Sequence, residues 1–239
     1  MKAILLKCVP VLLAATLFLL TKEATRSDAA VGDDAPGELA KLSPTGDVWY
    51  DAKRHAVVVD GEVCLREGQL EMFACPKGTK EHESIVSLKC KAEEVHAALL
   101  RAGAIPGKPV SFDPDYKPAA GQIIDIYVLW QDEDGKKHQA RAQEWIKDVK
   151  KDREMAYDWV FAGSGFWKDD ETGKEHYKAN GGDLVCVSNF PTATLDLPIQ
   201  STDANDELMF VAYKEHIPPR GTKVRVVFIP RAGADGKTK

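Results

Sequence analysis

The sequence lacks the complete motifs by which metal, nucleotide and serine chemistry are usually recognised. No HExxH helix motif, CxxC pair, GxGxxG turn or Walker loop occurs in the 239 residues. Ser164 lies in AGSGF, which departs from the GxSxG nucleophile motif at both outer positions. Structural zinc needs four ligands, and iron–sulfur clusters need a cysteine spacing that is absent here. We therefore expect no metal and no cofactor.

The chain also lacks an excess of positive charge. Residues 30–239 hold 28 Lys and Arg against 35 Asp and Glu, a net charge of −7. A protein that binds a polyanion needs a basic surface to displace counterions from the phosphates. We expect no nucleic-acid partner, and we expect the acidic balance to serve solubility.

Long apolar runs are absent except near the N-terminus. Two lysines precede an apolar run from Cys8 to Leu20, whose 13 residues are short for a membrane span but typical of a secretory signal. Ser27 and Ala29 place small residues at the two positions that a signal peptidase reads. We predict a signal peptide over residues 1–29 and a periplasmic or secreted chain. The alternative is an uncleaved anchor, the only route by which we expect a membrane contact.

The rest of the chain shows no internal repeat and no Pro, Gly and Ser-rich linker inside residues 44–230. Residues 30–43 are rich in Gly, Pro, Ala and acids without periodicity, and residues 231–239 lack apolar anchors. We predict a flexible linker over 30–43, a single globular domain over 44–230 and a disordered tail over 231–239.

The domain sequence is rich in strand patterns and holds one clear helix. Ala92, Val95, Leu99 and Ala102 recur at helical spacing, and Gly103 supplies a left-handed stop. Strand patterns follow at VVV (57–59), ESIVSLKC (83–90), DWVFAG (158–163), DLVCVS (183–188), ELMFVAY (207–213) and KVRVVFI (223–229). We predict an α+β, mainly β domain, with antiparallel sheets and one main helix packed on a face.

Turn residues suggest how some strands connect. The segment 123–145 alternates apolar and polar residues on both sides of Asp134-Gly135, which predicts a hairpin. Asp60-Gly61 is typical of a bulge or a second turn. If residues 62–75 form a hairpin that turns at Glu67-Gly68, residue 64 faces residue 71 and residue 75 faces residue 60. Cys64 and Cys75 would then not lie opposite each other.

The segment FACPKGTKEHES, residues 73–84, gathers the residues that could act as a catalytic site. A Cys75 thiolate with His82 as base and Glu83 beside it would suit a thiol enzyme, and Cys75 with His82 could supply two metal ligands. Cys186 is a possible additional partner. The alternative is a plain turn followed by a strand, in which His82 or Ser84 bonds a backbone group. We favour the turn.

Four cysteines fall outside the predicted leader. An even number in an oxidising compartment permits two disulfides in three connectivities, and we leave all three open. The alternative is that these thiols act as small buried hydrophobes, since three of them lie in apolar strand patterns. The four residues are Cys64, Cys75, Cys90 and Cys186.

A second region of interest is FAGSGFWKDDETGKEHYKANGGD, residues 161–183. Phe166, Trp167 and Tyr177 could line a ligand groove or could pack on the core, and we favour the core because aromatic side chains chiefly pack. The acids from Asp169 to Glu171 lack the alternation of an EF-hand and are expected to solvate a turn. His96 lies beside the apolar stripe of the predicted helix and is expected in the core.

Several stretches of the sequence resemble one known family. They are VVVDGEVCLREGQLEMFACPKGTKEHESIVSLKC, VHAALLRAGAIPGKPV, WVFAGSGFWKDDETGKEHY and GGDLVCVSNFPTATLDLPI. Together they are similar to the YdjY-domain group of uncharacterised exported bacterial proteins, over most of residues 43–230. Some members carry ferredoxin-like cysteine clusters, whose spacing this chain lacks. The resemblance implies export and assigns no substrate, activity or catalytic residue.

Two functions are consistent with these observations. The first is a non-catalytic envelope or secreted module that binds an unknown small molecule or an envelope protein through its polar loops. The second is a thiol- or metal-dependent enzyme centred on Cys75, His82 and Glu83. A thiol within about 4 Å of an imidazole nitrogen in an open cleft would favour the enzyme, because nucleophile and base must be near hydrogen-bonding reach.

Overall fold

The computed structural model describes residues 39–200 and 209–232, all of which lie in the unit Val31–Lys239. The predicted signal peptide, most of the predicted linker and most of the predicted tail fall outside these residues. Within the range assigned to the linker, Leu39–Lys41 form strand β1 and pair with the next strand. The start of the predicted strand 207–213 is also outside the described residues.

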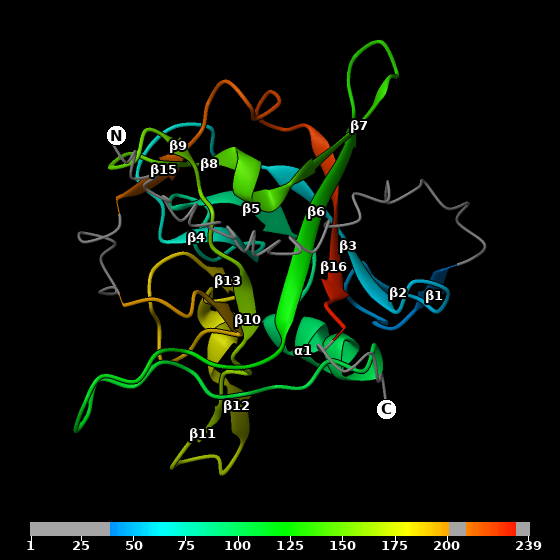
Figure 1. Ribbon diagram of the computed structural model, residues 1–239. Helices are drawn as coiled ribbons and strands as arrows, with labels where there is room; N and C mark the ends of the chain where they lie inside the picture. The colour runs from blue at the N-terminus through cyan, green and yellow to red at the C-terminus, as the bar shows by residue number, and fades with distance from the viewer. Residues whose placement is uncertain (1–38, 201–208, 233–239) are drawn as a thin grey trace, which may run out of the picture. The chain divides into compact units, whose positions relative to one another are not determined.

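Eight strands of the largest sheet form a closed ring. Each strand pairs with two neighbours, and the pairing of β3 with β5 closes the circle (Figure 1). Around the ring the strands are β3 (Ala56–Val63), β16 (Lys223–Pro230), β6 (Ile123–Gln131), β10 (Trp159–Phe161), β14 (Leu195–Asp196), β13 (Val185–Cys186), β4 (Met72–Pro76) and β5 (Ser84–Leu88). The fold is therefore a β-barrel.

The predicted architecture, antiparallel sheets with one main helix packed on a face, is wrong. Within the described residues the strand content and the single α-helix are as the patterns indicate, but the sheet closes on itself. Two of the ring's pairings, β4 with β5 and β13 with β14, are parallel. The partner of each strand depends on contacts between segments far apart in the chain, and alternation along a strand carries no information about them.

The predicted turn or bulge at Asp60-Gly61 lies instead inside the continuous strand β3. On one edge, the first half of β3 pairs with β2 (Val48–Asp51), and the second half pairs with β5. A Cβ on Gly61 would lie 2.5 Å from the Ser87 carbonyl oxygen. Glycine is therefore required where β5 crosses onto β3.

Residues 62–75 do not form the hairpin that the sequence analysis considered, because β5 lies between β3 and β4. Since β4 and β5 are parallel, the connecting residues 77–83 must run back along a five-residue strand of roughly 16 Å. Seven residues span at most about 25 Å, so this loop has little slack. It lies along the outer side of the β4–β5 pair, where it buries Cys75.

The remaining strands extend or flank the ring. Strand β7 pairs with β6, which confirms the predicted hairpin over residues 123–141; residues 142–145, predicted to continue the return strand, form a 3₁₀ helix instead. A three-stranded sheet has the order β15, β8, β9, and β11 pairs with β12 in a separate hairpin that projects from the barrel in Figure 1. Their bounds are β7 (Lys137–Arg141), β8 (Ile146–Asp148), β9 (Arg153–Glu154), β11 (Phe166–Lys168), β12 (Glu175–Tyr177) and β15 (Phe210–Ala212); two 3₁₀ helices are η1 (Ala142–Trp145) and η2 (Lys178–Gly181).

The single α-helix of the described residues, α1 (Ala92–Arg101), confirms the predicted helix. Glu94 accepts the Lys91 backbone N–H at 2.8 Å, which satisfies one donor of the first turn. Gly103 ends the helix with φ +85°. The helix lies against β2, β3 and η2, and its apolar side joins the main core. No helix in the described part of the chain has the length and apolarity that crossing a membrane requires.

The barrel interior forms the main hydrophobic core. Alternate residues of the long strands point into it, such as Ile124, Ile126 and Val128 on β6. Its largest fully buried side chains include Trp145 and Trp159. Residues of the opposite parity on β3 and β16 form a smaller cluster on the outer side. Polar chemistry therefore has to occur at the loops or on the outer surface of the barrel.

Candidate functional site

The three predicted catalytic residues do not converge. Cys75 lies on β4 with no exposed surface, whereas the His82 side chain is 76% exposed. The His82 ring faces its neighbour, with Nε2 lying 3.7 Å from the Glu83 carboxylate. Within the described residues no hydrogen bond joins the Cys75 thiol to His82. Burial raises the pKa of the Cys75 thiol, which opposes formation of a nucleophilic thiolate.

The four cysteines of the described chain carry free thiols. Burial raises the pKa of Cys64 to about 12, and it also raises the pKa values of Cys90 and Cys186. The Cys186 carbonyl accepts the Trp159 indole N–H at 2.7 Å in the core. Cys64, Cys75 and Cys186 are buried, and Cys90 is half-buried.

The aromatic candidates divide into one buried and two exposed residues. Tyr177 is 2% exposed, and its hydroxyl lies 2.8 Å from His96 Nδ1 and 3.1 Å from Thr194 Oγ1. Phe166 and Trp167 lie on the projecting β11–β12 hairpin and are 62% and 48% exposed. The structure thus places Tyr177 and His96 at the core boundary, and it places Phe166 and Trp167 away from it.

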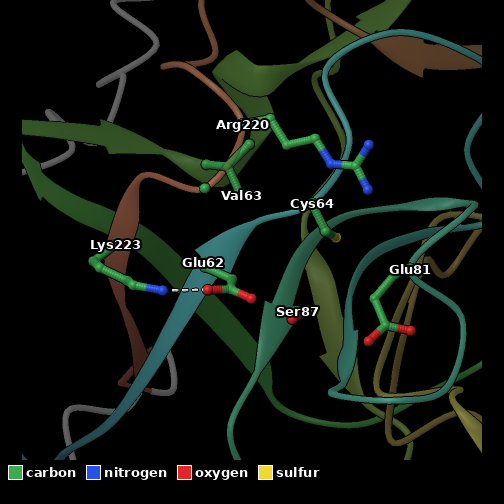
Figure 2. Close-up of a pocket in the computed structure, with 8 residues that line it drawn as sticks. Glu62, Val63, Cys64, Glu81, Ser87, Arg220 and Lys223 are labelled. Atoms are coloured by element: carbon green, nitrogen blue, oxygen red, sulfur yellow. Dashed lines mark hydrogen bonds and ion pairs between the residues drawn. The ribbon is translucent and has the colours of Figure 1, made fainter.

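An open pocket with a volume of about 390 Å³ lies on the outer side of the barrel near the β3–β5 pairing (Figure 2). This volume lies within the range of small-molecule sites. The pocket is lined by the end of β3 and the residue after it, by β5, by the loop 77–83, and by the turn before β16 with the first residue of that strand. The lining residues are Glu62, Val63, Cys64, Glu81, Ser87, Arg220, Gly221 and Lys223.

One wall of the pocket is a tight turn that presents Arg220. The turn is closed by the Thr222 N–H bonding to the Pro219 carbonyl at 3.1 Å, and Gly221 has φ +88° at its third position. The Gly221 N–H donates to the Val63 carbonyl at 2.8 Å, which fixes the turn to β3. The exposed Arg220 guanidinium makes no ion pair with any described residue.

The opposite wall is the loop 77–83, which presents Glu81. One oxygen of the Glu81 carboxylate accepts the Gly78 N–H at 2.5 Å. The other oxygen makes no hydrogen bond or ion pair within the part of the chain that the structure describes. Figure 2 shows Arg220 and Glu81 on either side of Cys64. The segment that the sequence singled out therefore does contribute to a site, through Glu81 rather than Cys75, His82 or Glu83.

The third side holds a carboxylate that is already neutralised. Glu62 is paired with Lys77 at 3.1 Å and with Lys223, as the dashed line in Figure 2 shows. These two lysines lower the pKa of Glu62 and keep it ionised. The charge of Glu62 is therefore already paired, whereas Arg220 and Glu81 form no ion pair with any described residue.

The floor of the pocket is uncharged. The Cys64 thiol donates to the Ser84 carbonyl at 3.0 Å, and with a pKa of about 12 it stays protonated at neutral pH. Ser87 adds a hydroxyl on the neighbouring strand. A neutral floor between a guanidinium and a carboxylate suits recognition of a polar ligand.

Sequence reasoning missed this pocket almost entirely. Only Cys64 was singled out, as a possible disulfide partner, whereas Arg220 lay in IPPRG, which is typical of a chain break. An arginine in the centre of a Pro-Gly turn was the one available signal, because such a turn holds a side chain out from a fixed backbone. In the described residues, no group of three or more His, Cys, Asp or Glu side chains is placed to hold a metal ion.

Fold and site together define a small closed β-barrel domain with a polar pocket on its outer side. The family model of the YdjY domain matches residues 48–229, and the chain belongs to this family. The expected family relationship is therefore confirmed. No curated protein and no solved structure matches the chain.

Proposed function

We propose that this YdjY domain is an exported, non-catalytic binding module whose pocket takes a small ligand that carries a carboxylate. The observation that carries the proposal is the Arg220 guanidinium, which borders a cavity of about 390 Å³ and has no ion-pair partner among the described residues. Guanidinium presents a planar fork of donors that matches a carboxylate in a bidentate pair.

The surroundings of Arg220 support binding rather than chemistry. The thiol that lines the pocket, that of Cys64, is held protonated with a pKa of about 12. A thiol nucleophile requires a lowered pKa and an adjacent base, and the lining residues include no histidine. Export is supported by the charged and apolar pattern of residues 1–29.

Binding is tested by comparing each carboxylate with its neutral amide. The folded chain is titrated with propionate and propionamide, and with hexanoate and hexanamide, while backbone amide NMR shifts are followed. We expect saturable shifts at pocket residues for the carboxylates, and at least tenfold weaker binding of the amides. Arg220→Gln should abolish this preference, since the charged hydrogen-bond donor is removed.

The matched control is Arg153→Gln. Arg153 is exposed on β9, does not line the pocket, and loses the same charge on substitution. This variant should bind like the parent chain. Shifts confined to other surfaces, or equal affinities of the Arg220→Gln and Arg153→Gln variants, would rule out the proposed site.

A further inference from the structure

The pocket contains a second charge that has no ion-pair partner among the described residues, and it has the opposite sign. Glu81 is half-buried, with one carboxylate oxygen occupied by the Gly78 N–H at 2.5 Å and the other unbonded within the described residues. No ion pair joins Glu81 to Arg220, although both line one cavity. The two groups therefore lie too far apart for a direct ion pair.

The other charged groups at the pocket are already paired with one another. Glu62 is held between Lys77 and Lys223, and the Cys64 thiol is protonated. What remains for a ligand is one guanidinium on the turn that precedes β16 and one carboxylate on the loop 77–83. A simple carboxylate would satisfy the first and leave Glu81 beside another negative charge, which is unfavourable.

We infer that the ligand is a small zwitterion, an amino acid or short peptide, whose carboxylate pairs with Arg220 and whose ammonium pairs with Glu81. This inference rests on the proposed function, and it adds an ammonium group on the ligand that pairs with Glu81. An ammonium group donates three hydrogen bonds, and the second oxygen of Glu81 accepts none from the residues that the structure describes. The cavity of about 390 Å³ has room for a ligand of this size.

The charge separation that the pocket prefers can be measured with a homologous series. The probes are glycine, β-alanine, 4-aminobutanoate, 6-aminohexanoate and glycylglycine, each titrated by NMR against the folded chain. We expect affinity to depend on length with a maximum at one member. At that length, N-acetylation or amidation of the probe should each weaken binding at least tenfold, because each removes one of the two charges.

Two variants assign each charge to its residue. Glu81→Gln should remove the penalty of N-acetylation and keep the penalty of amidation, and Arg220→Gln should do the reverse. Glu133→Gln is the control, since Glu133 is exposed on the β6–β7 turn and does not line the pocket. It should leave both penalties unchanged.

The outcomes separate this inference from the proposed function. If propionate or hexanoate binds as well as the best zwitterion and Glu81→Gln changes nothing, the zwitterion inference is wrong while the carboxylate site stands. If no probe binds, or if Arg220→Gln is silent, both are wrong. If binding requires the ammonium but is insensitive to amidation, the pocket recognises amines through Glu81, and the role of Arg220 is refuted.

Discussion

At the scale of single residues, burial decides which ionisable groups carry charge. Asp196, on β14, is fully buried, and this burial raises its pKa to about 8. Its Oδ1 accepts the Leu197 N–H at 2.8 Å and the Asn189 amide at 3.3 Å. Its Oδ2 has no hydrogen-bond partner among the described residues. The carboxyl group is therefore mainly protonated at neutral pH.

The state of Asp196 predicts a pH dependence of stability. An unperturbed aspartate has a pKa of 3.8, whereas the pKa of Asp196 in the folded chain is about 8, so between these values the folded state holds a proton that the unfolded state releases. The free energy of unfolding should then fall as pH rises from about 4 to 8, by at most about 1.4 kcal/mol per pH unit. Asp196→Asn, which mimics the protonated group, should flatten this slope.

Urea unfolding of both chains at pH 5, 6, 7 and 8 measures this effect. Relative to the parent, Asp196→Asn should gain up to about 4 kcal/mol between pH 5 and pH 8, because the slope of about 1.4 kcal/mol acts over three pH units. Asp170→Asn, at an exposed acid of the β11–β12 turn, should parallel the parent at every pH. Equal slopes for the parent and Asp196→Asn would show that Asp196 is not protonated in the folded state.

At the scale of elements, the loop 77–83 depends on one partly buried cation for its position. Lys80 Nζ lies 3.1 Å from Asp183, 3.4 Å from Glu83 and 3.8 Å from Glu71, and it lies 4.6 Å from the centre of the Phe190 ring. Burial disfavours its charge, but the Asp183 and Glu83 carboxylates outweigh burial and raise the pKa of Lys80. Lys80 thus ties the pocket wall that carries Glu81 to the barrel.

Removing this cation should loosen the loop. Lys80→Met keeps the apolar stem but leaves Asp183, whose side chain is 12% exposed, beside other carboxylates without a cation. We expect a loss of about 1–3 kcal/mol in urea unfolding, below the value for a fully buried pair because the Lys80 side chain is 26% exposed. Hydrogen exchange measured by mass spectrometry should rise in peptides that cover residues 77–83.

Lys77→Met is the matched control within the same loop. Lys77 pairs with Glu62 at 3.1 Å, but its side chain is 54% exposed, so the loss should stay below about 1 kcal/mol. Exchange in the loop should stay close to that of the parent. An equal effect of the two substitutions would show that the loop is not held through Lys80.

Some elements of the fold could be predicted from sequence patterns alone, and others could not. The helix 92–101 and the hairpin of β6 and β7 were predictable, because helical spacing and a Gly turn are local signals. The parallel pairing of β4 with β5 was not, since the short loop 77–83 suggests a simple turn and its backward path follows only from tertiary contacts. The pocket was missed for the same reason, because Cys64, Glu81 and Arg220 meet only when the ring closes.

At the scale of the whole molecule, counting the free thiols tests both the predicted export and the fold. The sequence has five cysteines, of which Cys8 lies in the predicted leader and four lie in the barrel domain as free thiols. Three of these four are buried. Burial of a thiol with a raised pKa slows its alkylation, since the thiolate is the reactive form.

Chain purified from the periplasm of a Gram-negative host should therefore contain four alkylatable thiols per molecule in denaturant, with or without prior reduction. Intact mass after iodoacetamide treatment gives this count and, independently, the N-terminus, which should lie at Ala30 if the leader is removed after Ala29. Without denaturant, alkylation at Cys64, Cys75 and Cys186 should be slow because all three are buried. A count of two before reduction would establish a disulfide that the structure lacks, and a count of five would show that the leader is retained. A chain that retains its leader is heavier by the mass of the whole leader, whereas a chain with a disulfide is not. A single spectrum therefore shows whether the prediction of export or the prediction of free thiols is wrong.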